Sequence, residues 1–199
     1  MRSTLSIQPK AWRAWWIIYK MCITAIYPKK NLSKLGKPQY RMPYLLRGLD
    51  ISRPNQVWSI DITYIPMLHG FMYLTAIIDV YSRSIMAWGL HNTLDKENSI
   101  EVLRLAVEAH GAPEIINSDQ GSQYTSSLWL STCEEFGIKV SMDGRGRCKD
   151  NIWIERFWHT IKTEYIYINP EESMEYYNNR RSHQGIAHQI PMERYKNAA

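Results

Sequence analysis

Three acidic residues stand in contexts where a carboxylate could do chemistry. Asp61 lies in the middle of the alternating stretch 57–65, on the face opposite its apolar residues. Asp119 closes the apolar run 114–118, which is typical of a short buried strand, and Glu155 falls in a long stretch of helical periodicity. Carboxylates are hard oxygen ligands suited to Mg²⁺ or Mn²⁺. The alternative is that these are three of the 19 acids in paired or solvated positions, although an ionised carboxylate between isoleucines is costly to bury.

Several short motifs follow one another in the order of a known family. They lie at 53–58, 61–65, 79–83, 117–123, 150–162 and 177–183. Over roughly the last 170 residues they resemble the transposases of insertion-sequence family three, in the branch similar to insertion sequence one-fifty. The resemblance implies that Asp61, Asp119 and Glu155 form the acidic triad of a retroviral-integrase-type core with the ribonuclease-H-like fold.

The resemblance also implies a polynucleotidyl transferase that depends on metal ions. Two Mg²⁺ or Mn²⁺ ions on the triad would hold the attacking and leaving oxygens of an in-line displacement. DNA is first hydrolysed at an element's end, and the exposed 3′-hydroxyl is then transferred into target DNA. Three acids without a Cys/His ligand set argue against zinc. Two alternatives stay open: a shortened, non-catalytic remnant that binds DNA or the intact transposase, and a stand-alone nuclease, which the terminal signature 177–183 disfavours.

Further residues are expected to contact DNA. Lys162 follows Glu155 by seven positions on the same helical flank, and a solvated lysine is the alternative. The loop 143–149 is basic and glycine-spaced, which favours a DNA-contacting flap over a plain surface loop. The predicted DNA contacts are Lys162, Asn151, Gln123, Arg145, Arg147, Lys149, Lys29 and Lys30.

Positive charge is concentrated at the N-terminus. Residues 1–54 carry 11 Lys and Arg against one acid (+10), and the remainder carries 13 against 18 (−5). A basic arm before an acidic body predicts a DNA partner, with a solvated leader as the alternative. The resemblance implies a homo-oligomer on DNA. Because the family's helix-turn-helix region looks mostly absent here, it also implies a partner protein from an upstream reading frame.

Composition narrows the class of protein. With 45% hydrophobic and 22% charged residues the chain is ordinary globular material. Its three cysteines form no C-x-x-C pair, which suggests no disulfide framework and fits a reducing cytoplasm. There is no G-x-x-x-x-G-K phosphate loop, so no nucleotide cofactor is expected. The longest uncharged apolar run, 14–19, is far shorter than the roughly 20 residues of a membrane span.

The periodicity predicts an α/β fold with a mixed five-stranded sheet flanked by helices. Strands at 57–65, 71–79 and 84–90 suit an antiparallel meander. They are followed by a helix at 96–110, a strand ending at Asp119, a helix at 126–136, an edge strand at 138–141 and a helix from Asp150 to Ile168.

These patterns divide the chain into three parts. We expect a basic N-terminal arm and linker at 1–54, the catalytic core at 55–168 and a C-terminal signature segment at 169–199. The family implies one more helix before the signature at Tyr177, for which the segment 165–176 looks too short. Asp79, at a strand end, is interpreted as a structural residue paired with Arg83.

Overall fold

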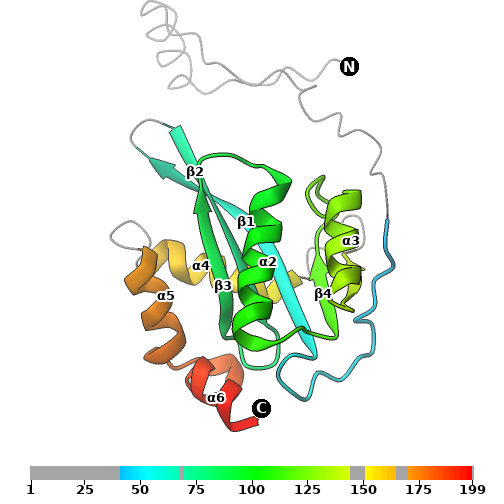
Figure 1. The fold of residues 1–199 in the computed structure, drawn as a ribbon. Coiled ribbons are helices and arrows are strands. Elements are labelled where there is room, and N and C mark those ends of the chain that lie inside the picture. Colours follow the sequence, from blue (N-terminus) through cyan, green and yellow to red (C-terminus); the bar gives the residue numbers. More distant parts are fainter. Residues whose placement is uncertain (1–40, 68–69, 144–150, 165–169, 199) are drawn as a thin grey trace, which may run out of the picture. The chain divides into compact units, whose positions relative to one another are not determined.

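The computed structural model describes residues 41–67, 70–143, 151–164 and 170–198, all within one compact unit, 36–199. A five-stranded mixed sheet organises this unit (Figure 1). The strands are β1 (Val57–Met67), β2 (Gly70–Asp79), β3 (Ile85–His91), β4 (Ile115–Ser118) and β5 (Lys139–Met142). β1, β2 and β3 form the antiparallel meander, and β4 and β5 run parallel to β1 in the order β3-β2-β1-β4-β5. The predicted sheet is confirmed, with strand ends shifted by at most two residues.

Helices cover both faces of the sheet. In Figure 1, α2 (Lys96–His110) lies in front of it, with α3 (Ser127–Glu135) beside α2, and α4 (Ile152–Glu164) passes behind. The alternation of β1 decides which side chains meet which helices. Trp58 and Ile60 share one core with α2 and α3, whereas Ile65 shares a second core with α4 and α5 (Pro170–Asn179). Asp61 alternates with Ile60 and therefore faces α4.

Local signals explain where the helices begin and end. α2 stops at Gly111, whose φ of 77° suits glycine and whose N–H donates to the Val107 carbonyl. α3 begins after Ser126, whose hydroxyl accepts from the Trp129 N–H at 3.2 Å. The bounds predicted for α2 are confirmed, and those predicted for α3 differ from the structure by one residue at each end. None of the described helices is long and apolar enough to cross a membrane.

The C-terminal segment differs from expectation. A helix does precede the end of the signature, because α5 runs through Tyr177 instead of ending before it. Tyr177 is buried against Phe157 of α4, with ring centroids 4.9 Å apart. A short 3₁₀ turn, η2 (Gln184–Ile186), and α6 (Pro191–Ala198) complete the chain. The signature therefore contributes to the core beneath α4.

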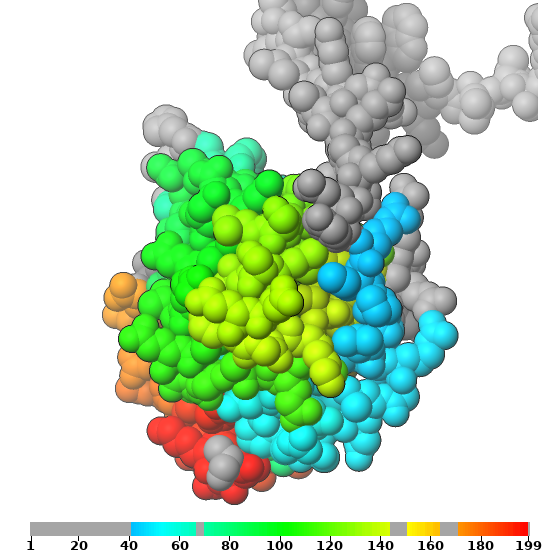
Figure 2. All heavy atoms as spheres, turned by 45° about the vertical axis from the view of Figure 1, so that its right-hand side comes forward, coloured from blue at the N-terminus to red at the C-terminus, as the bar shows by residue number. Residues whose placement is uncertain are grey.

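Residues 42–45 pack on the last strand of the sheet, although the sequence predicts a linker there. The Met142 N–H donates to the Pro43 carbonyl at 3.4 Å, and the Leu45 N–H donates to the Ser141 hydroxyl at 3.1 Å. Figure 2 shows this blue-to-cyan stretch against the yellow-green part of the surface. It covers the edge at β5, which would otherwise present unpaired backbone groups.

Asp79 is structural, as predicted. The Arg83 N–H donates to its backbone carbonyl at 2.8 Å, whereas its carboxylate accepts hydrogen bonds from Asn55 and Ser82. It is fully buried, and one carboxylate oxygen accepts from the Asn55 N–H at 2.9 Å. The other accepts from the N–H and hydroxyl of Ser82 at 2.7 and 2.6 Å. Asp79 thus ties the turn after β2 to the segment before β1.

Candidate active site

The sheet brings Asp61 and Asp119 to the same level. β1 and β4 are parallel, and their last paired residues are Ser59 and Asn117. Asp61 and Asp119 each lie two residues further on, so parallel geometry places them side by side where β4 ends. Asp61 is mostly buried in mid-strand, and Asp119 is exposed on the loop that follows β4.

The helix α4 carries Glu155 to the part of the sheet where Asp61 lies. The indole N–H of Trp158, three residues after Glu155, donates to Oδ2 of Asp61 at 2.9 Å. Residues three apart are neighbours on one side of a helix, so Glu155 lies one turn from this contact. Its side chain is exposed. The first turn of α4 therefore presents Glu155 beside the strand that carries Asp61.

The electrostatics show that the three carboxylates interact. Burial raises the pKa of Asp61 to about 6, against hydrogen bonds from Trp158 and the Ile62 backbone, and the charges of Asp119 and Glu155 add to the increase. The buried Tyr124 also responds to the negative charge of this site. Burial raises the pKa of its hydroxyl, and the charges of Asp61 and Asp119 raise it further. The site concentrates negative charge around a partly buried carboxylate, which a cation would stabilise.

A tight turn holds Asp119. Its Oδ1 accepts from the Gly121 N–H at 2.8 Å, and a Cβ at Gly121 would lie 2.8 Å from that oxygen. The same Cβ would lie 3.0 Å from Oε1 of Gln123, so Gln123 also folds over this turn. The amide of Gln120 donates to the Asp143 carbonyl at 2.8 Å and joins the turn to the end of β5. A side chain at 121 would therefore displace the Asp119 carboxylate, which lies against this glycine.

A buried row of polar side chains underlies the carboxylates. Ser59, Asn117 and Ser141 are in register across β1, β4 and β5, and all are fully buried. Ser141 donates to Asn117 at 2.8 Å, and Asn117 donates to Asp143 at 2.8 Å. At the other end Ser59 donates to the side-chain oxygen of Asn151. This row links the end of β5 to the start of α4.

The donor set fits a hard divalent cation, because it consists of carboxylate oxygens and because the charges of Asp119 and Glu155 raise the pKa of Asp61. As the side chains stand, however, no group of three or more His, Cys, Asp or Glu residues in the described part of the chain is arranged to hold a metal ion. Asp61 and Asp119 each accept a hydrogen bond from the protein through one oxygen. Metal ligation by this triad therefore stays a prediction.

The predicted DNA contacts have different positions. Lys162 is half-buried on α4 in line with Glu155 and Trp158, and Gln123 is half-buried beside Asp119. Asn151 is only 5% exposed and is held by Ser59, so its side chain supports the start of α4. The remaining predicted contacts, Lys29, Lys30, Arg145, Arg147 and Lys149, lie outside the described residues.

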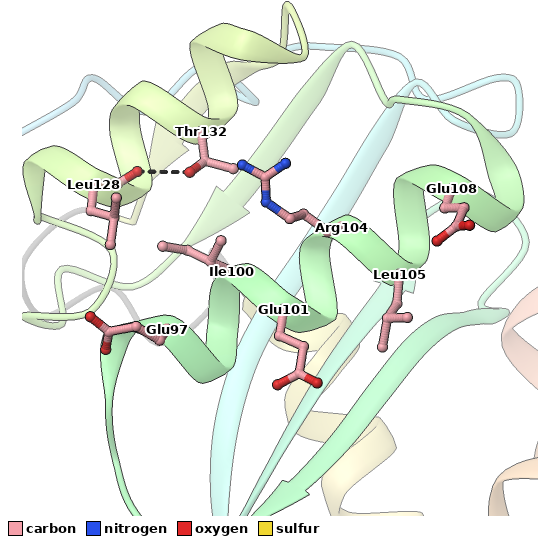
Figure 3. Close-up of a pocket in the computed structure, with 8 residues that line it drawn as sticks. All are labelled: Glu97, Ile100, Glu101, Arg104, Leu105, Glu108, Leu128 and Thr132. Carbon is pink, nitrogen blue, oxygen red and sulfur yellow. Dashed lines mark hydrogen bonds between the residues drawn. The ribbon is translucent and has the colours of Figure 1, made fainter.

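A groove of about 360 Å³ between α2 and α3 lies on the other face of the sheet from Asp61 (Figure 3). Inside it the Thr132 hydroxyl donates to the Leu128 carbonyl at 2.9 Å. Three glutamates on its α2 side would repel a phosphate backbone, so we do not place DNA here. The lining residues are Glu97, Ile100, Glu101, Arg104, Leu105, Glu108, Leu128 and Thr132.

Comparison with known proteins identifies the family. The family model of the integrase core domain matches residues 51–148. The transposase for insertion sequence element IS904 of Lactococcus lactis is 34% identical over 181 residues, which cover 84% of this chain and 72% of that protein. The chain belongs to the IS3-family insertion-sequence transposases. The described part is the integrase-type catalytic core of an IS3-family transposase, as the resemblance predicts.

Other IS3-family proteins are longer than this chain. The InsF transposase for insertion sequence IS3A of Escherichia coli is 32% identical over 118 residues, covering 58% of this chain and 41% of that protein.

Among solved structures, the HTLV-2 integrase catalytic core in complex with magnesium has a TM-score of 0.61 at 19% identity, covering 72% of this chain and 97% of that one. At this identity the likeness shows the fold alone, and the predicted ribonuclease-H-like fold is confirmed.

Two contacts at this IS3-family site were missed by the sequence reasoning. The helical periodicity places Trp158 among the apolar residues of its helix, but only the structure shows that its indole N–H donates to Asp61. Asp143 was grouped with the basic loop, yet its carboxylate accepts from Asn117 beneath Asp119. A signal existed for Trp158, because a buried indole N–H usually finds an acceptor and Asp61 is a strand acid that needs a donor.

Proposed function

We propose that this core cuts DNA at the ends of its element and joins the freed 3′ ends to target DNA, with Asp61, Asp119 and Glu155 as the metal ligands. The observation that carries the proposal is the common level of Asp61 and Asp119 on parallel strands, with Glu155 one helical turn from the residue that bonds Asp61. This arrangement supports one site formed by three residues that are distant in the sequence. The charges of Asp119 and Glu155 raise the pKa of Asp61, which supports a site made for cations.

The triad would bind Mg²⁺ or Mn²⁺, in a two-ion arrangement. Magnesium is bound by the HTLV-2 integrase core, which shares the fold. When bound, such ions supply positive charge that lowers the pKa of an attacking water or 3′-hydroxyl and stabilises the departing oxygen. Three carboxylates with no thiolate or imidazole among them suit these hard cations better than zinc.

The chain's own residues orient the ligands and hold the nucleic acid. Trp158 donates to Oδ2 of Asp61, and the Gly121 N–H donates to Oδ1 of Asp119, so the protein would orient both carboxylates. Lys162, in line with Glu155, would contact a phosphate, and Gln123 would approach DNA beside Asp119. The basic residues Lys29, Lys30, Arg145, Arg147 and Lys149 would bind the phosphate backbone in a salt-sensitive way.

We also propose that the protein works as a homo-oligomer on DNA in the bacterial cytoplasm, with residues 1–54 as a DNA-binding arm, 55–168 as the core and 169–199 as the signature segment. A helix-turn-helix partner from an upstream frame would recognise the element ends. The bacterial origin of the related IS904 transposase supports the proposed location, and the excess of basic residues at 1–54 supports the proposed DNA-binding arm.

The test is cleavage of end-containing DNA by the purified full chain in Mn²⁺. Asp119→Asn and Glu155→Gln are each expected to abolish cleavage because they remove a charged ligand while keeping side-chain size. Glu108→Gln, an exposed acid on α2, is the matched control and should cleave like the wild type. Cleavage that survives both triad substitutions would remove the assignment.

A second candidate is a chain that binds DNA or intact transposase without turnover. The observation that favours it is that the described carboxylates do not close into a three-ligand cluster. The same experiment separates the two: binding of end DNA with no cleavage in Mn²⁺, and no change on Asp119→Asn, is the result expected of this second candidate.

A further inference from the structure

The Trp158 side chain is buried in the core and also hydrogen-bonds Asp61 of the candidate site. Its side chain is 6% exposed and lies against the Phe157 ring, with centroids 4.7 Å apart. Its indole N–H donates to Oδ2 of Asp61 at 2.9 Å, across 97 residues of sequence. The packing holds the ring in place, so the position of its donor is fixed by the core.

This bond, together with one from the Ile62 backbone, restricts the orientation of the Asp61 carboxylate. The terminal torsion of an aspartate is broad and nearly unrestrained by its own rotamer preferences. An indole N–H is a donor only, so it can hold a carboxylate oxygen but cannot itself bind a cation in competition with it. Oδ2 is engaged by Trp158, and the second oxygen is thereby directed away from the ring.

The same bond sets the register of α4 on β1. Glu155 lies three residues before Trp158 and on the same side of the helix. A slide of α4 by one turn would move Glu155 by about 5.4 Å relative to Asp61 and would break the bond from Trp158. The contact therefore couples the orientation of one carboxylate to the placement of another.

We propose that Trp158 is a positioning residue for divalent-cation binding, which orients the Asp61 carboxylate and holds Glu155 beside it. This inference rests on the proposed function of the acidic triad. Other indoles of the core lack this role. Trp58 donates to the side-chain oxygen of Asn55 at 3.0 Å, on the α2 and α3 face of the sheet.

The test measures Mn²⁺ affinity of the full chain from the electron paramagnetic resonance signal of free Mn²⁺. Trp158→Phe keeps an aromatic ring and removes the donor, and it is expected to weaken Mn²⁺ binding about tenfold or more, the usual effect of losing a bond to a metal ligand. Trp58→Phe is the matched control, because it also loses one buried indole hydrogen bond; its Mn²⁺ affinity should equal that of the wild type. In an Asp61→Asn background, Trp158→Phe should cause no further loss.

The outcomes separate this inference from the proposed function. Wild-type binding that depends on Asp61 but is unchanged by Trp158→Phe would overturn the positioning role and leave the triad intact. An equal loss in Trp58→Phe would also overturn it, because the effect would then follow general stability. Mn²⁺ binding that is the same in the wild type and Asp61→Asn would overturn the proposed function and this inference together.

A second measurement does not depend on the folding of a Trp158 variant. The indole N–H resonance of Trp158 in ¹⁵N-labelled protein should shift on Asp61→Asn, and should shift again when Mg²⁺ is added to the wild type. An indole resonance that responds to neither change would show that Trp158 does not act on this carboxylate.

Discussion

Asp61 in β1 and Asp119, the first residue after the parallel strand β4, each lie two residues beyond the paired Ser59 and Asn117. Because Asp61 is largely buried, its ionised form is disfavoured first by desolvation and then by the charges of Asp119 and Glu155, so its pKa rises to about 6. At neutral pH the metal-free protein therefore carries an ionised carboxylate where a neutral group would be more stable. Such a cost is expected where a site is built for a cation and not for stability.

Asp61→Asn should stabilise the metal-free protein at pH 7.5. The folded-state pKa of about 6 lies above the ordinary value of 3.8, so the native state binds more protons between these values. The stability that protonated Asp61 contributes is present below pH 4 and is lost as pH rises through 6. A shift of this size corresponds to about 3 kcal/mol, and the asparagine oxygen can still accept from Trp158.

Urea unfolding in EDTA between pH 4 and 8 checks this prediction. The gain from Asp61→Asn should be largest above pH 7 and should vanish near pH 4. Mg²⁺ should stabilise the wild type but not the variant, since the ion would bind only the charged site. A variant that is less stable than the wild type at pH 7.5 would contradict the raised pKa.

Gly121→Ala should displace the Asp119 carboxylate without unfolding the chain. The new Cβ would lie 2.8 Å from Oδ1 of Asp119 and 3.0 Å from Oε1 of Gln123, and both atoms are ends of side chains that can move. We expect Mn²⁺-dependent cleavage to fall about tenfold or more because a ligand is misplaced. The unfolding midpoint should hardly change. Gly185→Ala, whose Cβ meets nothing within 4 Å, is the control and should keep full cleavage.

Asp79→Asn should have the opposite effect to Asp61→Asn. Donors from Asn55 and Ser82 reach both oxygens of Asp79, so an amide group at this buried site would face a donor whichever way it turned. The expected loss is about 1–3 kcal/mol in the free energy of unfolding. Asp95→Asn is the control, because Asp95 precedes α2 without a side-chain cap bond. Equal stability of the Asp79 variant and the wild type would show that these bonds matter little.

The elements of the core could be predicted from sequence because their signals are local. The period of two in β1 and the Gly111 stop of α2 fix strands and helices without knowledge of the tertiary fold. α5 was missed because residues 177–183 were interpreted as a motif rather than as structure. Pro170, which suits the first position of a helix, was the available signal.

The contacts that shape the site are non-local and could not be predicted in the same way. Periodicity places Trp158 on the buried side of its helix, but many strand atoms could accept its N–H. Only the packing of α4 on β1 selects Asp61. The internal partner of Asn151, Ser59, is likewise 92 residues distant, so a buried amide could not be told from a DNA contact by spacing alone.

Asn178→Ala tests whether the C-terminal signature is structural. The Asn178 side chain accepts from the Ile85 N–H at 2.8 Å and donates to the Ile85 carbonyl at 2.9 Å, in the manner of a neighbouring strand at the open edge of β3. Losing both bonds should cost about 1–3 kcal/mol in urea unfolding. Asn179→Ala, at the exposed neighbouring position, should cost little. Cleavage per folded molecule should be unchanged in both, whereas lost DNA binding at unchanged stability would instead assign Asn178 to the nucleic acid.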